Sequence, residues 1–129
     1  MVPEDKAAEN LSVIVSRHPA AIQFIAEQLG GTVNALGVAV AGGKYIPVVA
    51  FATEDSVRGK LVYGNVPLSL ACSAAAVCVI EFQWTPPRGQ EYSLADMKAA
   101  GACLRWYGVL KTPEGGSLRD YLHQGGFEL

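Results

Sequence analysis

Residues 13–25 read VIVSRHPAAIQFI and contain the junction on which the predicted fold rests. The β-branched residues of the first three positions favour a buried, extended strand. Pro19 suits the first position of a helix, because its missing amide hydrogen would have no intrahelical partner there. Apolar residues then recur at helical spacing as far as Leu29, and the pair Gly30-Gly31 marks the helix end. We therefore predict a strand over 11–16 followed directly by a helix over 19–29.

The polar residues Ser16, Arg17 and His18 lie between that strand and that helix. Free backbone amides and the positive end of the helix dipole meet at such a point, which makes it a suitable anion site. Arg17 could hold a phosphate with its fork of donors, and His18 could transfer a proton near neutral pH. Equally, Arg17 could be a surface arginine paired with an acid, and His18 could cap the helix. Both interpretations stay open at this point.

The composition indicates one globular domain. The chain has 129 residues, of which 50% are hydrophobic and 17% are charged. A formal net charge of −2 argues against general binding to duplex DNA, although a few arginines could hold a small phosphorylated ligand. No stretch is long enough to span a membrane, and residues 1–11 carry charges where a signal peptide would be apolar. We expect a cytoplasmic protein.

The cysteines and histidines give no sign of a metal site. Cys72, Cys78 and Cys103 have no CxxC spacing, and their odd number speaks against a disulfide framework. The two histidines are far apart in the sequence, so a structural zinc site is not expected. P-loop, GxGxxG and HExxH patterns are absent as well. We predict free thiols in a reducing compartment, and no metal or cofactor.

The remaining sequence predicts strands that alternate with helices. Residues 1–10 form a polar arm, and two β-rich runs over 33–41 and 46–53 flank a hairpin turn at Gly42-Gly43-Lys44. A loop over 53–56, a strand over 60–64, a helix over 67–76 and a strand over 77–83 follow. A capping-box-like start at Ser93 opens a helix that we expect to end near residues 107–108. The order indicates a single α/β domain over 11–111 with a mainly parallel sheet, and a loose tail over 112–129 with one helical turn at 118–123.

A second strand-to-helix junction repeats the pattern of the first. Asn65-Val66-Pro67 follows a strand as Arg17-His18-Pro19 does, so two helix N-termini would meet at one crevice. Gly64 and Asn65 then lie beside the expected ligand. Asn65 could read a ribose or a base edge, or simply cap its helix.

The segment after the third strand adds further candidates. Arg88 lies in a Pro-Pro-Arg-Gly turn and could bind a second phosphate or remain a solvated loop charge, and the same two alternatives apply to Glu91. Trp84 could stack on a base or pack against protein.

Three blocks of sequence, in the same order, resemble the Csx-sixteen proteins, small accessories of type III CRISPR loci. The segment Ser16–Ala21 is similar to their N-terminal RHP motif, and Val62–Ala71 to their central strand-to-helix segment. The segment Arg88–Ser93, together with several positions up to Val109, resembles their C-terminal block. Ala20 stands where those proteins usually have a glycine. The resemblance covers roughly residues 12–111.

That resemblance implies a ring nuclease, an enzyme that degrades cyclic oligoadenylate and so ends an antiviral signal. We expect cyclic tetra-adenylate to be its substrate. It implies a Rossmann-like homodimer that holds the two-fold symmetric ring across its axis. It also implies metal-independent chemistry, in which a ribose 2′-hydroxyl attacks its own phosphodiester and leaves a 2′,3′-cyclic phosphate. Such an attack needs positioning and charge neutralisation more than a strong nucleophile, which fits an arginine beside helix N-termini.

We therefore expect Arg17 and His18 to be catalytic, and a set of ligand contacts at Ser16, Gly64, Asn65, Arg88 and Glu91. Two alternatives remain open: a protein that sequesters the ring without cleaving it, and an α/β interaction module in which the RHP turn is only a helix cap. Incubation with cyclic tetra-adenylate separates the three by cleavage, binding alone, or neither.

Overall fold

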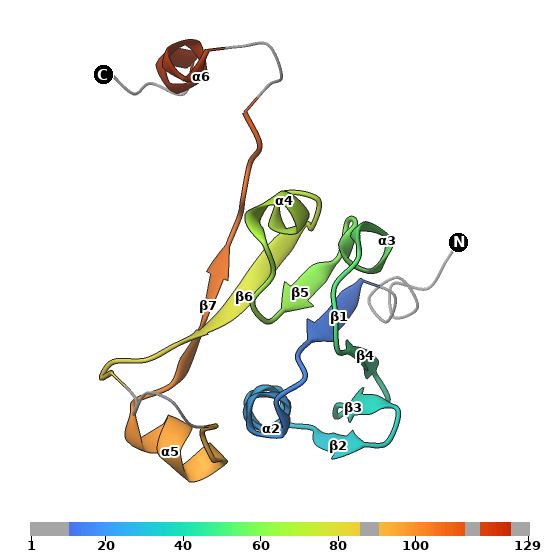
Figure 1. The fold of residues 1–129 in the computed structure, drawn as a ribbon. Helices are drawn as coiled ribbons and strands as arrows, with labels where there is room; N and C mark the ends of the chain where they lie inside the picture. The colour runs from blue at the N-terminus through green and yellow to red at the C-terminus, as the bar shows by residue number, and fades with distance from the viewer. Residues whose placement is uncertain (1–10, 86–90, 113–116, 125–129) are drawn as a thin grey trace.

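One seven-stranded sheet organises the computed structural model, which describes residues 11–85, 91–112 and 117–124. The strand order is β2-β3-β4-β1-β5-β6-β7 (Figure 1). The strands are β1 (Ser12–Val15), β2 (Thr32–Asn34), β3 (Gly37–Ala39), β4 (Tyr45–Val49), β5 (Leu61–Tyr63), β6 (Ala76–Glu81) and β7 (Cys103–Tyr107). The helices in these ranges are α2 (Pro19–Gln28), α3 (Glu54–Val57), α4 (Leu68–Ala71), α5 (Leu94–Ala99) and α6 (Leu118–Gln124).

The four central strands are parallel, and the strands at both edges are antiparallel. β1 pairs in parallel with β4 on one side and with β5 on the other, and β5 pairs in parallel with β6. β7 is antiparallel to β6, while β2 and β3 extend the other edge as antiparallel strands. The predicted α/β, Rossmann-like class with a parallel centre is confirmed.

The β1–α2 junction forms as its sequence predicts. Val13, Ile14 and Val15 are buried, so this central strand is covered on both faces, as an uninterrupted β-branched run requires. α2 has Pro19 at its first position and ends where Gly30 takes a φ of 70°. Its predicted range is correct to within one residue.

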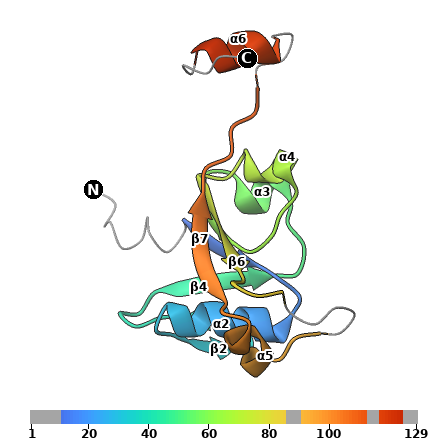
Figure 2. The ribbon, with the colours of Figure 1, turned by 90° about the vertical axis from the view of Figure 1, so that its left-hand side faces the viewer.

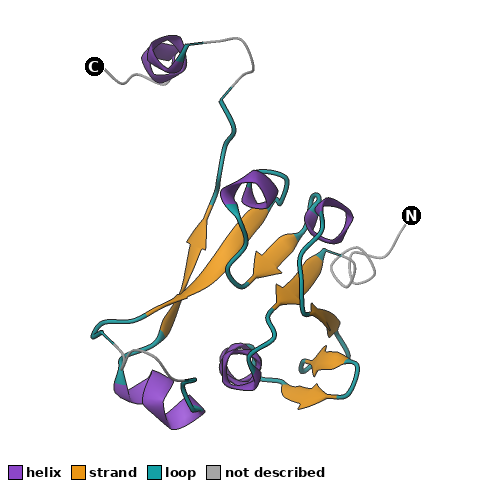
Figure 3. Cartoon of the chain, in the orientation of Figure 1, coloured by secondary structure: helices purple, strands orange, loops and turns teal. Residues whose placement is uncertain are grey.

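Helices cover both faces of the sheet and divide the core in two. On one face, α2 packs its residues Ile25 and Ala26 against Ile14, Tyr63 and Cys78. On the other face, a second cluster around Val13, Val15 and Val62 includes Val57 of α3 and Ala71 of α4. Figure 3 shows the strands between these two layers, with α5 on the same side as α2.

The β-rich region before residue 50 has one turn more than predicted. The run over 33–41 is two strands, β2 and β3, because the Asn34 side chain accepts hydrogen bonds from the amides of Leu36 and Gly37, each at 2.9 Å, and closes a tight turn. The predicted turn at Gly42-Gly43 is confirmed between β3 and β4. β4 belongs to this hairpin and to the parallel centre at once.

The expected long helix that starts at Ser93 is wrong in its second half. The capping box of Ser93 and Asp96 is present, but α5 ends at Ala99, and Gly101 turns the chain with a φ of 72°. A Cβ at Gly101 would lie 2.7 Å from the ring of Trp84, so only glycine fits there. Residues 103–107 form β7 instead, because they complete an antiparallel pairing with β6.

Two smaller predictions are also corrected. Most of the loop expected over 53–56 belongs to the one-turn helix α3 (Glu54–Val57), because Thr53 and Ser56 make a capping box. The helix expected over 67–76 stops at Ala71. The amide of Ala75 donates to the carbonyl of Lys60, and the amide of Gly59 donates to the carbonyl of Ser73, so the residues after α4 lie beside the residues that precede β5.

α6 confirms the helical turn predicted in the tail, and it stands apart from the sheet in two views (Figures 1 and 2). The predicted arm over residues 1–10 lies outside the described residues. None of the helices in the described ranges has the length and apolar character needed to cross a membrane.

Candidate functional site

The candidate site lies where the chain connections leave the sheet in opposite directions. From β1 the chain passes through α2 and the hairpins to β4 on one side, whereas from β5 it passes through α4 to β6 on the other. A crevice opens at the carboxyl ends of strands at such a switch point, and ligands of open α/β sheets bind there. Because β1 and β5 are direct neighbours, the two junctions that the sequence singled out do meet.

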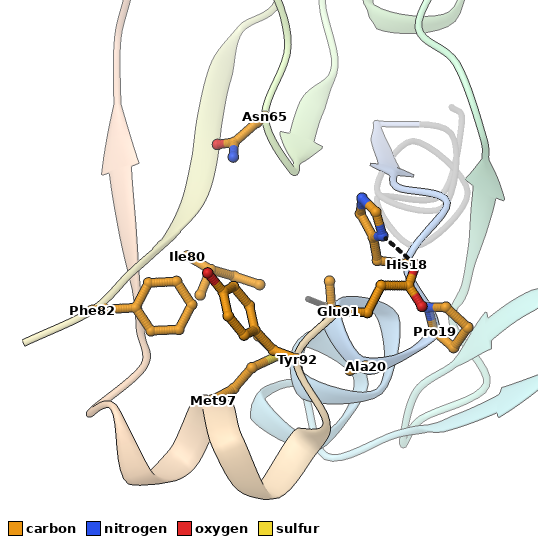
Figure 4. Close-up of a pocket in the computed structure, with 10 residues that line it drawn as sticks. His18, Pro19, Ala20, Asn65, Ile80, Phe82, Glu91, Tyr92 and Met97 are labelled. Carbon is orange, nitrogen blue, oxygen red and sulfur yellow. Dashed lines mark hydrogen bonds and ion pairs between the residues drawn. The ribbon is translucent and has the colours of Figure 1, made fainter. Parts of the chain in front are cut away.

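A cavity of about 460 Å³ occupies this region. That volume falls within the roughly 300–1,000 Å³ typical of small-molecule sites. Its lining comes from the start of α2, the loop after β5, the end of β6 and the region of α5: His18, Pro19, Ala20, Ala21, Asn65, Ile80, Phe82, Glu91, Tyr92 and Met97. Figure 4 shows His18 and Glu91 on one side, and Phe82, Tyr92 and Met97 gathered on the other.

His18 and Glu91 form a pair at the edge of this cavity. The Nδ1 atom of His18 lies 3.3 Å from Oε1 of Glu91. His18 occupies the N-cap position of α2, but its side chain makes no capping hydrogen bond, so the imidazole is not committed to the helix. A proton on Nδ1 would be donated to the carboxylate, which leaves Nε2 as a proton acceptor.

The pair contributes little to the fold. The side chains of His18 and Glu91 are 56% and 79% exposed, and exposed ion pairs stabilise proteins by only about 0.2–1 kcal/mol. Its 73-residue separation in sequence means that the fold brings it together. The sequence pattern singles out both residues but gives no reason to place them in contact.

Ser16 shapes the turn that carries His18. Its hydroxyl accepts a hydrogen bond from the amide of His18 at 3.1 Å, and its own amide donates to the carbonyl of Val49 in β4 at 3.0 Å. These bonds hold the backbone of the Ser16–His18 turn against the sheet.

Arg17 is not part of the cavity lining. Its guanidinium carbon lies 5.8 Å from the centre of the Phe51 ring, just beyond β4. Phe51 is 72% exposed, and a cation–π contact at an exposed site is worth about 0.5–1 kcal/mol. A charge-assisted hydrogen bond to phosphate is worth about 1.5–3 kcal/mol, so Arg17 can leave Phe51 for an anion at the turn.

Gly64 and Asn65 follow β5 and differ in their roles. Gly64 has a φ of 130°, and a Cβ there would lie 2.1 Å from the carbonyl oxygen of Val15, so it allows the close approach of β5 to β1. Asn65 lines the cavity and is exposed. α4 has Pro67 at its N-cap and no side-chain cap, so the helix-cap interpretation of Asn65 does not hold.

The apolar side of the cavity is what sequence reasoning missed. The sequence pattern singled out none of Ile80, Phe82, Tyr92 and Met97 as site residues. Phe82 and Tyr92 meet edge to face, with ring centres 6.1 Å apart. Their contact depends on how α5 packs beside α2, where Lys98 and Glu27 form an ion pair at 2.9 Å. Side chains alternate between the two faces of a strand, so Ile80 lies on the same face of β6 as Cys78. This alternation was the one signal in the sequence that could have pointed to the apolar side of the cavity.

Two further expectations concern residues at the margin. Arg88 lies outside the described residues, and its role stays a prediction. Trp84 is 62% exposed and is not part of the cavity lining. The described ranges hold no group of three or more histidine, cysteine or acidic side chains suited to a metal ion. The three cysteines are free thiols.

Comparison with family models matches residues 13–110 to the family described as "Putative CRISPR-associated protein (Cas_VVA1548)". The match includes both strand-to-helix junctions, the whole described cavity lining and β7. Comparisons with curated proteins and with solved structures found no match.

Proposed function

The chain belongs to this CRISPR-associated family, and on that premise we propose that it is a cytoplasmic ring nuclease that cleaves cyclic oligoadenylate, with cyclic tetra-adenylate as its preferred substrate. The observation that carries the proposal is the His18–Glu91 pair at the edge of a cavity located at the switch point of the sheet. The resemblance to the Csx-sixteen proteins supplies the substrate.

The geometry suits attack by an internal hydroxyl. Glu91 orients the imidazole through Nδ1, and Nε2 of His18 accepts the proton of a ribose 2′-hydroxyl. The 2′-oxygen forms a bond to the adjacent phosphorus, and the bond from phosphorus to the 5′-oxygen breaks. The products are a 2′,3′-cyclic phosphate and a 5′-hydroxyl, whose oxygen takes a proton from water. The hydroxide that this leaves takes the proton from Nε2, which returns His18 to its starting state. Both reacting groups belong to one nucleotide, so the protein mainly has to position them.

Arg17 neutralises the phosphate in this proposal. It turns from Phe51 toward the anion, at the turn where the amides at the start of α2 also face outward. In a homodimer with the ring on its two-fold axis, each residue would meet the ligand twice. Two arginines from two chains then face a ring that carries several phosphates.

The test is incubation of the purified protein with cyclic tetra-adenylate in excess EDTA. The products are separated by chromatography and identified by mass spectrometry. We expect linear products with a 2′,3′-cyclic phosphate. Loss of cleavage that magnesium or manganese restores would overturn the metal-independent mechanism. Tight binding without products would indicate a protein that sequesters the ring. The absence of both binding and cleavage would indicate an interaction module.

Ligand class is tested in parallel. The net charge of −2 predicts negligible affinity for duplex DNA at physiological salt, because counterion release needs many cationic contacts. Comparable affinities for random duplex DNA and for the ring would argue against a dedicated ring site. Light scattering of the free and ring-bound protein tests the proposed dimer.

A further inference from the structure

The cavity has a half that phosphodiester cleavage does not need. His18 and Glu91 account for proton transfer, yet the opposite wall consists of Ile80, Phe82, Tyr92 and Met97. Phe82 and Tyr92 are only partly buried, and their rings meet at 66°. An apolar, aromatic wall left open to a cavity is suited to a flat ring that stacks on it.

A nucleobase fits this wall better than other parts of a nucleotide. The ribose and the phosphate need several polar partners, and this wall offers only the hydroxyl of Tyr92, whereas unpaired bases commonly stack on aromatic side chains. A purine presents a larger stacking face than a pyrimidine. The wall therefore favours a purine.

Asn65 supplies the polar group that can tell two purines apart. Its side chain lines the same cavity, does not cap α4 and makes no hydrogen bond to another described residue. An amide offers one acceptor and two donors, which match the N6 donor and N7 acceptor of adenine. Guanine presents two acceptors at the corresponding edge, so it leaves the amide oxygen without a partner.

We propose that the wall formed by Ile80, Phe82, Tyr92 and Met97 is a subsite for an adenine base, with Asn65 reading its edge. The subsite takes the base of a nucleotide whose phosphate reaches the His18 turn, and in this respect it rests on the proposed function. It makes Asn65, Phe82 and Tyr92 specificity-determining residues, and it gives the protein a reason to prefer an oligoadenylate over other cyclic oligonucleotides.

Met97 offers a direct probe of this subsite. The chain has two methionines, so protein labelled at the methionine methyl groups gives two signals in an NMR spectrum. The signal that is missing from the spectrum of Met97→Leu belongs to Met97. Met97 lines the cavity while only 4% of it is exposed, so ring currents from a stacked base will move its signal. AMP, GMP, CMP and UMP are titrated separately, and each Kd is read from the shift of this signal.

We expect AMP to bind at least about tenfold more tightly than CMP or UMP, and more tightly than GMP. Phe82→Leu should weaken AMP binding about 5- to 150-fold, the usual range for loss of one stacking contact. Asn65→Ala should abolish the preference for AMP over GMP, while the matched variant Gln23→Ala, at an exposed amide of α2, should preserve it. Asn65 is exposed, so its variant is expected to fold even if Phe82→Leu does not.

Equal Kd values for AMP and CMP, no shift with any nucleotide, or an unchanged AMP preference in Asn65→Ala would each overturn the subsite. The cleavage assay separates this failure from that of the proposed function. AMP binding that depends on Asn65, without cleavage of the ring, would retain the subsite and reject the nuclease. Cleavage with a KM that Asn65→Ala and Phe82→Leu leave unchanged would retain the nuclease and reject the subsite.

Discussion

Replacement of His18 by alanine should separate catalysis from stability. The change removes the proton acceptor of the proposed reaction, so kcat should fall by about 10²–10⁴ while KM changes little. The side chain caps no helix, and its exposed pair with Glu91 is worth only about 0.2–1 kcal/mol. For a chain of this size that corresponds to a fall in Tm of no more than about 5 °C. A large loss of rate with a small loss of stability is the expected signature.

The assay is single-turnover cleavage of cyclic tetra-adenylate, with a thermal melt of each variant. His123→Ala is the matched control, because His123 is the other histidine of the chain and lies on α6, and it should cleave like the parent protein. Added imidazole should restore part of the rate of His18→Ala. Glu91→Gln should lose less rate than Glu91→Ala, because glutamine can still accept the hydrogen bond from Nδ1. Parental cleavage by His18→Ala would refute the proton-transfer role and leave catalysis to positioning and charge.

Three further predictions follow from individual contacts. Arg17→Ala should weaken ring binding about 10- to 100-fold. It should lower Tm by no more than about 5 °C, because it removes only the exposed contact with Phe51. Arg119→Ala on α6 should bind normally, and equal Kd values for the two variants would remove Arg17 from the site. Gly64→Ala should lower the free energy of unfolding, measured in a denaturant melt, by roughly 2–6 kcal/mol. The new Cβ would collide with the carbonyl oxygen of Val15, at a backbone conformation that alanine avoids. An unchanged denaturation midpoint would contradict the close approach of the strands. Burial raises the pKa of the Cys78 thiol, so its contribution to stability is complete below the unfolded pKa of about 8.5 and is lost as the pH rises through the folded pKa. Tm should therefore fall more steeply between pH 8 and pH 10 in the parent protein than in Cys78→Ala, and parallel curves would refute this.

Local signals explain why the β1–α2 junction was predictable. A β-branched run, a proline at the first helical position and a terminal glycine each act through the backbone of a few neighbouring residues, so they need no tertiary partner. The same holds for the capping box at Ser93 and for the turn at Gly42-Gly43.

Residues 103–107 show where local signals fail. Leu94, Met97 and Leu104 recur at a spacing that a helix would explain, but the gain from pairing with β6 lies outside that window. β7 forms because β6 offers an open edge, with Glu81 opposite Cys103 and Val77 opposite Tyr107. Pairing with a neighbouring strand overrides helical periodicity here. The spacing of apolar residues in the sequence does not reveal that another strand has an unpaired edge.

By itself, the sequence determined the α/β class, the central junction and the identity of the polar residues at the ends of β1 and β5. Only the tertiary structure decided that His18 meets Glu91, that Arg17 lies over Phe51, and that Phe82 and Tyr92 wall the cavity. The reason is physical. The junctions are built by interactions within a turn or two of chain, whereas the cavity depends on how α2 and α5 pack side by side on one face of the sheet, and residues far apart in sequence become neighbours only through that packing.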